Sequence, residues 1–215
     1  MKFRLMRPNM AIRKKRIKFS REVVHDLKEV SKLSSSKQWE FAGNIEYKNF
    51  KFSKPNIVTS KKRNRVEGPE IDKVWYSEMS FHTHPGIGHH DGTVCQNTPI
   101  FATLPSNADF DAYIKGFPEM QVNIICDSHG YYVINILKSA YMRASPLPEA
   151  VHEYMRKVRS KPFMRICVFS DNGIEYFQTT VKNWKREINE YVDPEMMKLF
   201  GVSIRYYGYD DEPPI

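Results

Sequence analysis

The chain has 215 residues, of which 41% are hydrophobic and 27% charged, as in ordinary globular proteins, so wholesale disorder is excluded. No stretch of about 18 apolar residues is present that could span a bilayer. The formal net charge of +8 favours acidic partners, but no helix-turn-helix, RNA-recognition or zinc-finger signature accompanies the basic clusters. We therefore expect one main core in an intracellular protein, cytoplasmic or nuclear, with no membrane partner and no dedicated nucleic-acid function.

The first third of the chain alternates strand and helix patterns. Ser20 has the character of an N-cap, and the valines and Leu27 that follow it recur at the spacing of one helix face. The predicted elements are, in order, a strand at 11–19, a helix at 21–33 ended by the serine-rich stretch 34–38, strands at 39–47 and 51–60, a polar loop at 61–72 and a strand at 74–84.

The remaining elements predict an α/β protein. They are a glycine-rich loop at 85–105, a helix that begins at Ser106, a hairpin of strands at 121–127 and 131–137, a helix at 145–161, strands at 163–169 and 173–181, a helix at 181–191 and a closing element at 196–209 whose kind the pattern leaves open. This order indicates one mixed β-sheet with helices packed against it.

Two histidines near the end of the predicted strand at 74–84 suggest a metal site. Because side chains alternate along a strand, His82 and His84 point the same way, and two imidazoles so placed can bind one ion. Catalytic zinc is held by three protein ligands and keeps a fourth position open. A polar strand face would explain the His-x-His spacing equally well.

Asp109 is the natural third ligand. Ser106 is a helix N-cap by pattern, which places Asp109 in the first turn and directs its carboxylate toward whatever lies beyond the helix end. An ordinary capping box gives the same Ser-x-x-Asp sequence. A hydrolytic zinc site also needs a base that takes a proton from water, and Glu40, at the start of an apolar strand where burial raises a carboxyl pKa, offers one. The alternative for Glu40 is an edge-strand glutamate that faces solvent.

Taken together, these residues form a recognisable series. Glu40-x-x-Gly43 on a strand after an amphipathic helix, His82-Thr83-His84-Pro85 at the end of a later strand, and Pro105-Ser106-x-x-Asp109 at the start of a helix resemble the JAMM, or MPN-plus, metalloprotease family. These proteins are zinc isopeptidases that remove ubiquitin and ubiquitin-like proteins from lysine side chains. The resemblance covers about residues 11–140.

The resemblance implies a mixed-sheet MPN/JAMM core of the cytidine-deaminase-like type, and it implies roles for five residues. His82, His84 and Asp109 would hold Zn2+, Glu40 would activate water and pass its proton to the leaving amine, and Ser106 would support the oxyanion. The partner would be ubiquitin or a ubiquitin-like protein. Its extended tail would lie beside an exposed strand edge, with the strand near 74–81 and the loop after residue 85 as walls.

Two features depart from the family pattern. Between His84 and Ser106 lie 21 residues rather than about seven, so we expect an insertion at about 86–100 in a catalytic core that spans 1–145. Its potential ligands for a second metal are His89, His90, Asp91 and Cys95, although shaping access for the substrate is the simpler role. Residues 146–215 match no family pattern and are expected to form a helical and strand extension packed on the core.

Two alternatives keep the fold. One is a catalytically inactive MPN scaffold or binding module, although this chain retains the ligands that inactive members lack. The other is a JAMM-type peptidase with a non-ubiquitin substrate. Neither HExxH nor the zinc signature of nucleobase deaminases is present, so other zinc chemistries fit the sequence less well. Ubiquitin linkage preference, an activating partner and the oligomeric state stay open.

Overall fold

A six-stranded mixed sheet forms the centre of the protein. The computed structural model describes residues 19–75, 77–87, 99–137, 147–161, 169–171 and 174–211. The strand order is β11-β8-β7-β5-β1-β4, with bounds β1 (Ala42–Asn44), β4 (Asn56–Val58), β5 (Met79–Thr83), β7 (Val122–Cys126), β8 (Gly130–Ile136) and β11 (Val202–Gly208). Only β5 and β7 are parallel neighbours in this sheet. The predicted α/β class with a mixed sheet flanked by helices is confirmed.

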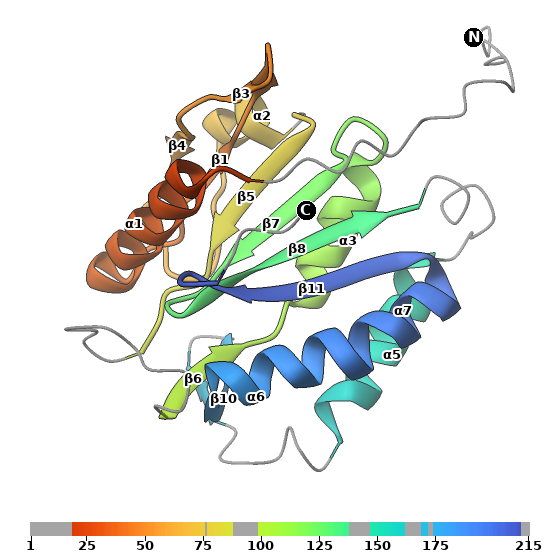
Figure 1. Ribbon diagram of the computed structural model, residues 1–215. Coiled ribbons are helices and arrows are strands. Elements are labelled where there is room, and N and C mark those ends of the chain that lie inside the picture. Colours follow the sequence, from red (N-terminus) through yellow and green to blue (C-terminus); the bar gives the residue numbers. More distant parts are fainter. Residues whose placement is uncertain are drawn as a thin grey trace, which may run out of the picture.

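Helices cover the two faces of this sheet separately. Helix α1 (Arg21–Lys37) lies on one side, whereas α3 (Asn107–Gly116) lies on the other, together with α5 (Leu147–Arg159), α6 (Val181–Arg186) and α7 (Asp193–Phe200) (Figure 1). The alternation of side chains along β7 creates two cores: Ile124 packs in the cluster under α1, and Ile125 in the cluster under the other helices. Both side chains are fully buried.

Helix α1 begins as predicted and ends later than predicted. The Ser20 side chain accepts a hydrogen bond from the Val23 backbone N–H, as an N-cap does. The serine-rich stretch does not break the helix, however, because Ser34 is buried and its hydroxyl donates to the Trp39 carbonyl at 2.6 Å, while the half-buried Ser35 hydroxyl hydrogen-bonds with that of Ser128. The helix ends at Lys37, where Gln38 adopts the left-handed conformation.

The region between α1 and β5 is more broken than predicted. The strand predicted at 39–47 is realised only as β1 and the short β2 (Tyr47–Lys48), and the strand at 51–60 splits into β3 (Lys51–Phe52) and β4. Helix α2 (Pro69–Trp75) begins inside the predicted polar loop. The strand predicted from residue 74 therefore starts only at Met79, because Val74 belongs to the helix and is buried there.

The long loop predicted at 85–105 contains a strand. Strand β6 (Pro99–Thr103) pairs with β10 (Ile174–Thr180), which also pairs with β9 (Phe169–Asp171), so a second, three-stranded sheet forms. The pairing partner of β6 lies more than 70 residues later in the sequence, so local patterns gave no signal for it. The predictions for 11–18, for 163–168 and for the insertion residues 88–98, including His89, His90, Asp91 and Cys95, lie outside the described residues.

The C-terminal segment completes the sheet. The helix predicted at 181–191 begins as α6 and continues through a π-helical stretch, Glu187–Val192, into α7. The closing element contains β11, which pairs along its whole length with β8. The division of the chain at residue 145 stays a prediction.

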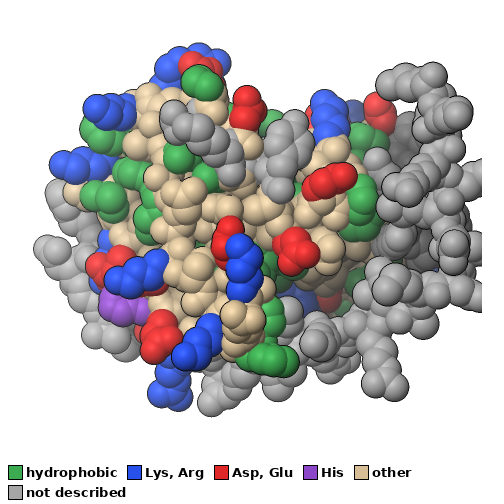
Figure 2. Space-filling model, turned by 90° about the horizontal axis from the view of Figure 1, so that it is seen from above, with side chains coloured by type: hydrophobic (Ala, Val, Ile, Leu, Met, Phe, Trp, Pro, Cys, Tyr) green, Lys and Arg blue, Asp and Glu red, His purple; other side chains and the backbone are tan. Residues whose placement is uncertain are grey.

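The surface carries mixed charges. On the face seen in Figure 2, Lys and Arg side chains alternate with Asp and Glu, and hydrophobic side chains lie between them. The positive net charge is therefore not gathered into one patch on the described part of this face. Within the described residues, no helix is both long enough and apolar enough to cross a membrane.

Gly43 is required where β1 meets its neighbours. A Cβ atom at this position would overlap the Asn56 carbonyl oxygen of β4 and the Phe81 ring of β5. We expect Gly43→Ala to lower the free energy of unfolding by roughly 1–3 kcal/mol, since β4 or the ring must move. Urea denaturation measures this change. Gly116→Ala is the control, because its Cβ would meet only the flexible Met120 side chain, and a Gly43→Ala loss no larger than the control's would contradict the close approach.

Candidate metal centre

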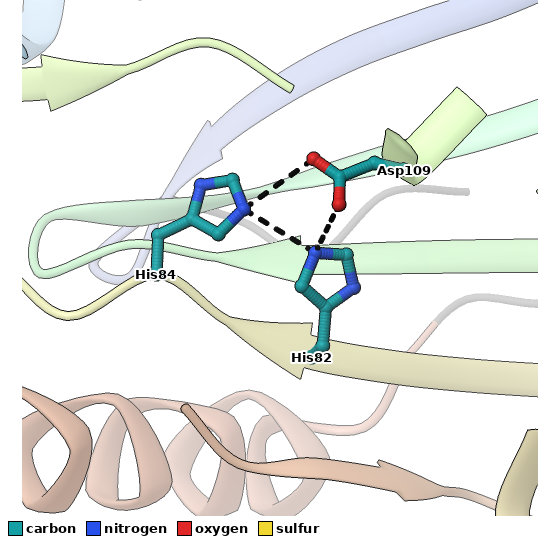
Figure 3. Close-up of side chains that lie close together, drawn as sticks. All are labelled: His82, His84 and Asp109. Carbon is teal, nitrogen blue, oxygen red and sulfur yellow. Dashed lines mark hydrogen bonds and ion pairs between the residues drawn. The ribbon is translucent and has the colours of Figure 1, made fainter. Parts of the chain in front are cut away.

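Three predicted ligands converge on one point above β5. His82 lies in β5, His84 follows its end, and Asp109 comes from the first turn of α3 (Figure 3). The His82 Nε2 atom is 3.0 Å from Asp109 Oδ1, and the His84 Nε2 atom is 3.4 Å from Asp109 Oδ2. The two Nε2 atoms are 3.3 Å apart. The three side chains therefore lie close enough together to hold a metal ion.

The spacing of the two imidazole nitrogens fits a tetrahedral ion. Metal–ligand distances of about 2.0–2.1 Å and tetrahedral angles separate two ligand atoms by about 3.3–3.4 Å, and the two Nε2 atoms are 3.3 Å apart. The contacts to Asp109, at 3.0 and 3.4 Å, are made by its two different oxygens. Both imidazoles are buried, and the Asp109 side chain is 14% exposed. Two nitrogens and one carboxylate oxygen in such a setting are a donor set that suits zinc.

The first turn of α3 fixes the direction of Asp109. Ser106 is the N-cap, as predicted: its hydroxyl oxygen accepts the Asp109 backbone N–H at 3.2 Å, and Asp109 Oδ2 accepts the Ser106 N–H at 2.6 Å. This capping box does not compete with ligation, because a carboxylate has enough lone pairs to accept from the backbone and face both imidazoles. The capping-box interpretation and the metal-ligand interpretation thus describe the same carboxylate.

Thr103 orients His84. Its hydroxyl lies 3.2 Å from His84 Nδ1, and both side chains are buried. If the Nδ1–H donates to Thr103 Oγ1, the lone pair on Nε2 is free for a metal. Thr103 was not among the predicted site residues, because this hydrogen bond depends on β6, which lies within the predicted loop. The apolar run at 100–102 just before it was the available sequence signal.

Thr83 connects the histidines to the segment that carries Glu40. The Thr83 hydroxyl accepts the Phe41 N–H at 3.0 Å and donates to Ser34 Oγ at 2.8 Å, while the Thr83 N–H donates to the Phe41 carbonyl at 2.9 Å. Thr83 points away from the metal centre, toward α1. Its hydroxyl therefore fixes β5 relative to the chain next to Glu40.

Glu40 lies beside the centre rather than in a strand. It precedes β1 by two residues, and its backbone is held at both ends: its N–H donates to the Lys62 carbonyl at 2.7 Å, and its carbonyl accepts the Thr59 hydroxyl at 2.6 Å. The residue is 7% exposed, which contradicts the solvent-facing alternative. Burial raises the pKa of Glu40 to about 8, while nearby His84 lowers it and nearby Asp109 raises it.

The pKa of Asp109 is shifted in the opposite direction from that of Glu40. Burial alone would raise its pKa, but the two neighbouring imidazoles outweigh burial and hold the pKa of Asp109 well below its usual value of 3.8. The centre therefore contains one carboxylate that stays ionised and one carboxyl that can carry a proton near neutral pH. Active sites often contain two carboxyl groups whose surroundings shift their pKa values in opposite directions, so that one stays charged and the other exchanges protons.

The strand that was expected to be a wall for the substrate tail has no free edge of its own. Strand β5 is paired with β1 on one side and with β7 on the other, so the exposed edge expected beside the centre would have to belong to another strand. An extended substrate therefore cannot add to β5.

The raised pKa of Glu40 predicts a pH-dependent stability in metal-free protein. The folded chain keeps the Glu40 proton up to about pH 8, while the unfolded chain releases it near 4.5, so the stabilising contribution is full below 4.5 and is lost as pH rises toward 8. Glu40→Gln cannot ionise. We expect the free energy of unfolding of the wild type to fall, relative to that of Glu40→Gln, by a few kcal/mol between pH 5 and pH 8.

Urea denaturation with a chelator at the two pH values measures this difference. Glu46→Gln is the control, because its side chain is 52% exposed and no comparable growth is expected. A constant difference between Glu40→Gln and the wild type would show that the carboxyl is ionised in the folded chain throughout this range.

Two comparisons with known proteins find nothing similar to this chain. No protein-family model matches the chain, and no match is found among curated proteins.

Proposed function

We propose that this protein is a zinc-dependent isopeptidase of the JAMM type, with an MPN/JAMM core, that hydrolyses conjugates of ubiquitin or a ubiquitin-like protein. One observation carries the proposal: His82, His84 and Asp109 lie close enough together to hold one ion beside a buried Glu40 whose pKa is raised to about 8. A metal site alone needs only the first three residues. Hydrolysis also requires a group that takes a proton from water, and the buried Glu40 carboxyl next to these residues can do so.

His82, His84 and Asp109 would hold the ion. Two neutral imidazoles and one carboxylate leave its net charge positive and one coordination position open. When bound, Zn2+ supplies a Lewis acid that polarises a carbonyl and lowers the pKa of water. The Thr103 hydroxyl would keep His84 in the tautomer that ligates through Nε2.

Glu40 would act as the general base and then as the general acid. Its carboxylate takes a proton from water as the water oxygen bonds to the scissile carbonyl carbon, and it returns this proton to the lysine nitrogen as the C–N bond breaks. Of the two protons of water, one passes through Glu40 to the amine and the other stays on the new carboxylic acid, which then releases it to solvent as it ionises. Buried surroundings keep the base from bulk water and strengthen its interactions with the reacting atoms.

Ser106 would stabilise the developing oxyanion. Its oxygen already accepts the Asp109 N–H, which leaves its own O–H free to donate. A hydroxyl at the N-terminus of α3 is also aided by the helix dipole, which favours negative charge there. The choice of ubiquitin or a relative as substrate rests on the family resemblance.

Two variants test the proposed roles. Glu40→Gln should keep zinc but lose at least about two orders of magnitude of turnover, as expected when a general base is removed. His84→Ala should lose both metal and activity. Elemental analysis of protein purified without chelator reports the zinc, with about one ion per chain expected for the wild type, and cleavage of linked ubiquitin dimers reports the activity.

His25→Ala, a substitution on α1 outside the centre, serves as the control and should change neither value. Full activity of Glu40→Gln would show that the base is another group. A wild type that holds zinc but cleaves no ubiquitin linkage would exclude the proposed substrate and favour the peptidase alternative, if it cleaves other peptides, or the scaffold.

A further inference from the structure

The segment after residue 146 reaches the supports of the metal centre at three points. Tyr176 donates its hydroxyl to the Pro85 carbonyl, directly after His84, and Arg159 donates to the Pro105 carbonyl, directly before Ser106. Trp184 donates to Tyr132, which in turn donates to the Thr103 carbonyl. None of the three residues is a predicted ligand. Tyr176 and Arg159 bind backbone carbonyls next to His84 and Ser106, and Trp184 reaches the Thr103 carbonyl through Tyr132.

Of the three residues, Tyr176 is connected most directly to His84. In the β6–β10 pairing it stands opposite Thr103, whose hydroxyl orients His84. Its own hydroxyl donates to the Pro85 carbonyl at 2.8 Å, and its side chain is 0% exposed. The same residue thus holds the chain on the C-terminal side of His84 and the strand that carries the hydrogen-bond partner of its imidazole.

The other two contacts brace the same strand and the turn after it. Trp184 Nε1 donates to the Tyr132 hydroxyl at 2.7 Å, and Tyr132 donates to the Thr103 carbonyl at 2.7 Å, all within the buried core. Arg159 reaches the Pro105 carbonyl at 2.9 Å and forms an ion pair with Glu175 of β10 at 3.0 Å. Strand β6 and the turn that leads to Asp109 are therefore held from β8, β10, α5 and α6.

From this geometry we infer that Tyr176 is a positioning residue for His84, and that the segment after residue 146 sets the metal affinity of the centre. The inference rests on the metal site of the proposed function, but not on its substrate. A ligand that is already held in its binding orientation loses less conformational freedom when the ion arrives. Outer residues that orient a ligating histidine commonly change metal affinity by about 10–100-fold.

The test compares two variants that each lose one tyrosine hydroxyl. Tyr176→Phe removes the hydrogen bond to Pro85, whereas the control Tyr154→Phe removes a hydroxyl that donates to Glu195 at 2.6 Å, in the same C-terminal segment and away from the ligands. Zinc affinity is measured by competition with a chelator. Thermal unfolding in excess chelator reports the stability of the metal-free fold, and the visible absorption of the Co2+-loaded protein reports coordination geometry.

We expect Tyr176→Phe to weaken zinc binding at least about tenfold and to alter the Co2+ spectrum, while Tyr154→Phe leaves both unchanged. Thr103→Val, which removes the hydroxyl at the His84 end of the same connection, should weaken zinc by a similar factor. If both effects run through His84, the double variant should lose less than the product of the two single losses.

Unchanged zinc affinity in Tyr176→Phe would overturn the inference. Equal losses in Tyr176→Phe and Tyr154→Phe, matched by equal losses of metal-free stability, would also overturn it, because they would indicate a general effect on folding. A wild type that binds no zinc would remove the metal site and the inference together. A wild type that binds zinc without cleaving conjugates would refute the proposed activity and leave the inference standing.

Discussion

The centre depends on holding one carboxylate between two imidazoles at the end of a helix. Asp109 Oδ1 lies against His82, and Asp109 Oδ2 lies against His84 while accepting the Ser106 N–H. A buried carboxylate without partners would be costly, and here its charge is compensated by imidazoles, by a backbone donor and by the positive end of the α3 dipole. The same contacts that make Asp109 tolerable in the folded chain also direct it at the point where an ion would sit.

The second carboxyl near the centre, that of Glu40, has a raised pKa where that of Asp109 is lowered. Glu40 gains no comparable set of donors, so burial dominates and raises its pKa to about 8, whereas the imidazoles hold the pKa of Asp109 low. Binding of a cation would favour the ionised form of Glu40 and so lower its pKa toward neutrality. A carboxyl whose pKa lies near working pH is suited to accept and return a proton, and one that is always ionised is suited to ligation.

Local sequence patterns predicted the parts of the centre that depend on neighbouring residues. The alternation of a strand placed His82 and His84 on one face, and the capping pattern placed Asp109 in the first turn of α3; both expectations are confirmed by the geometry. The position of Glu40 outside a strand was not predictable in this way. It is set by Lys62 and Thr59, whose hydrogen bonds to the Glu40 backbone come from about 20 residues away.

The failures of prediction share a physical cause. Strand β6 was read as loop because a short strand is stabilised by its pairing partner, and that partner, β10, comes from the far end of the chain. The serines at 34–36 were read as helix breakers because serine hydroxyls compete with the backbone for hydrogen bonds. In the folded chain, Ser34 instead donates to the Trp39 carbonyl and Ser35 hydrogen-bonds with Ser128, so tertiary structure removes this competition at both residues.

Long-range contacts also explain why the C-terminal segment matters to a centre to which it contributes no ligand. The cluster of buried side chains on the α3 side of the sheet contains Ile125 and Tyr132 together with Phe177 and Trp184, so residues from both parts of the chain share one core. Because such cores are close-packed, a displacement of β10 is passed to β6 instead of being absorbed. Thr103 lies on β6, within hydrogen-bond distance of His84. The orientation of one ligand is therefore a property of the whole packed core, and the chain from α5 to β11 is part of what holds the centre in shape.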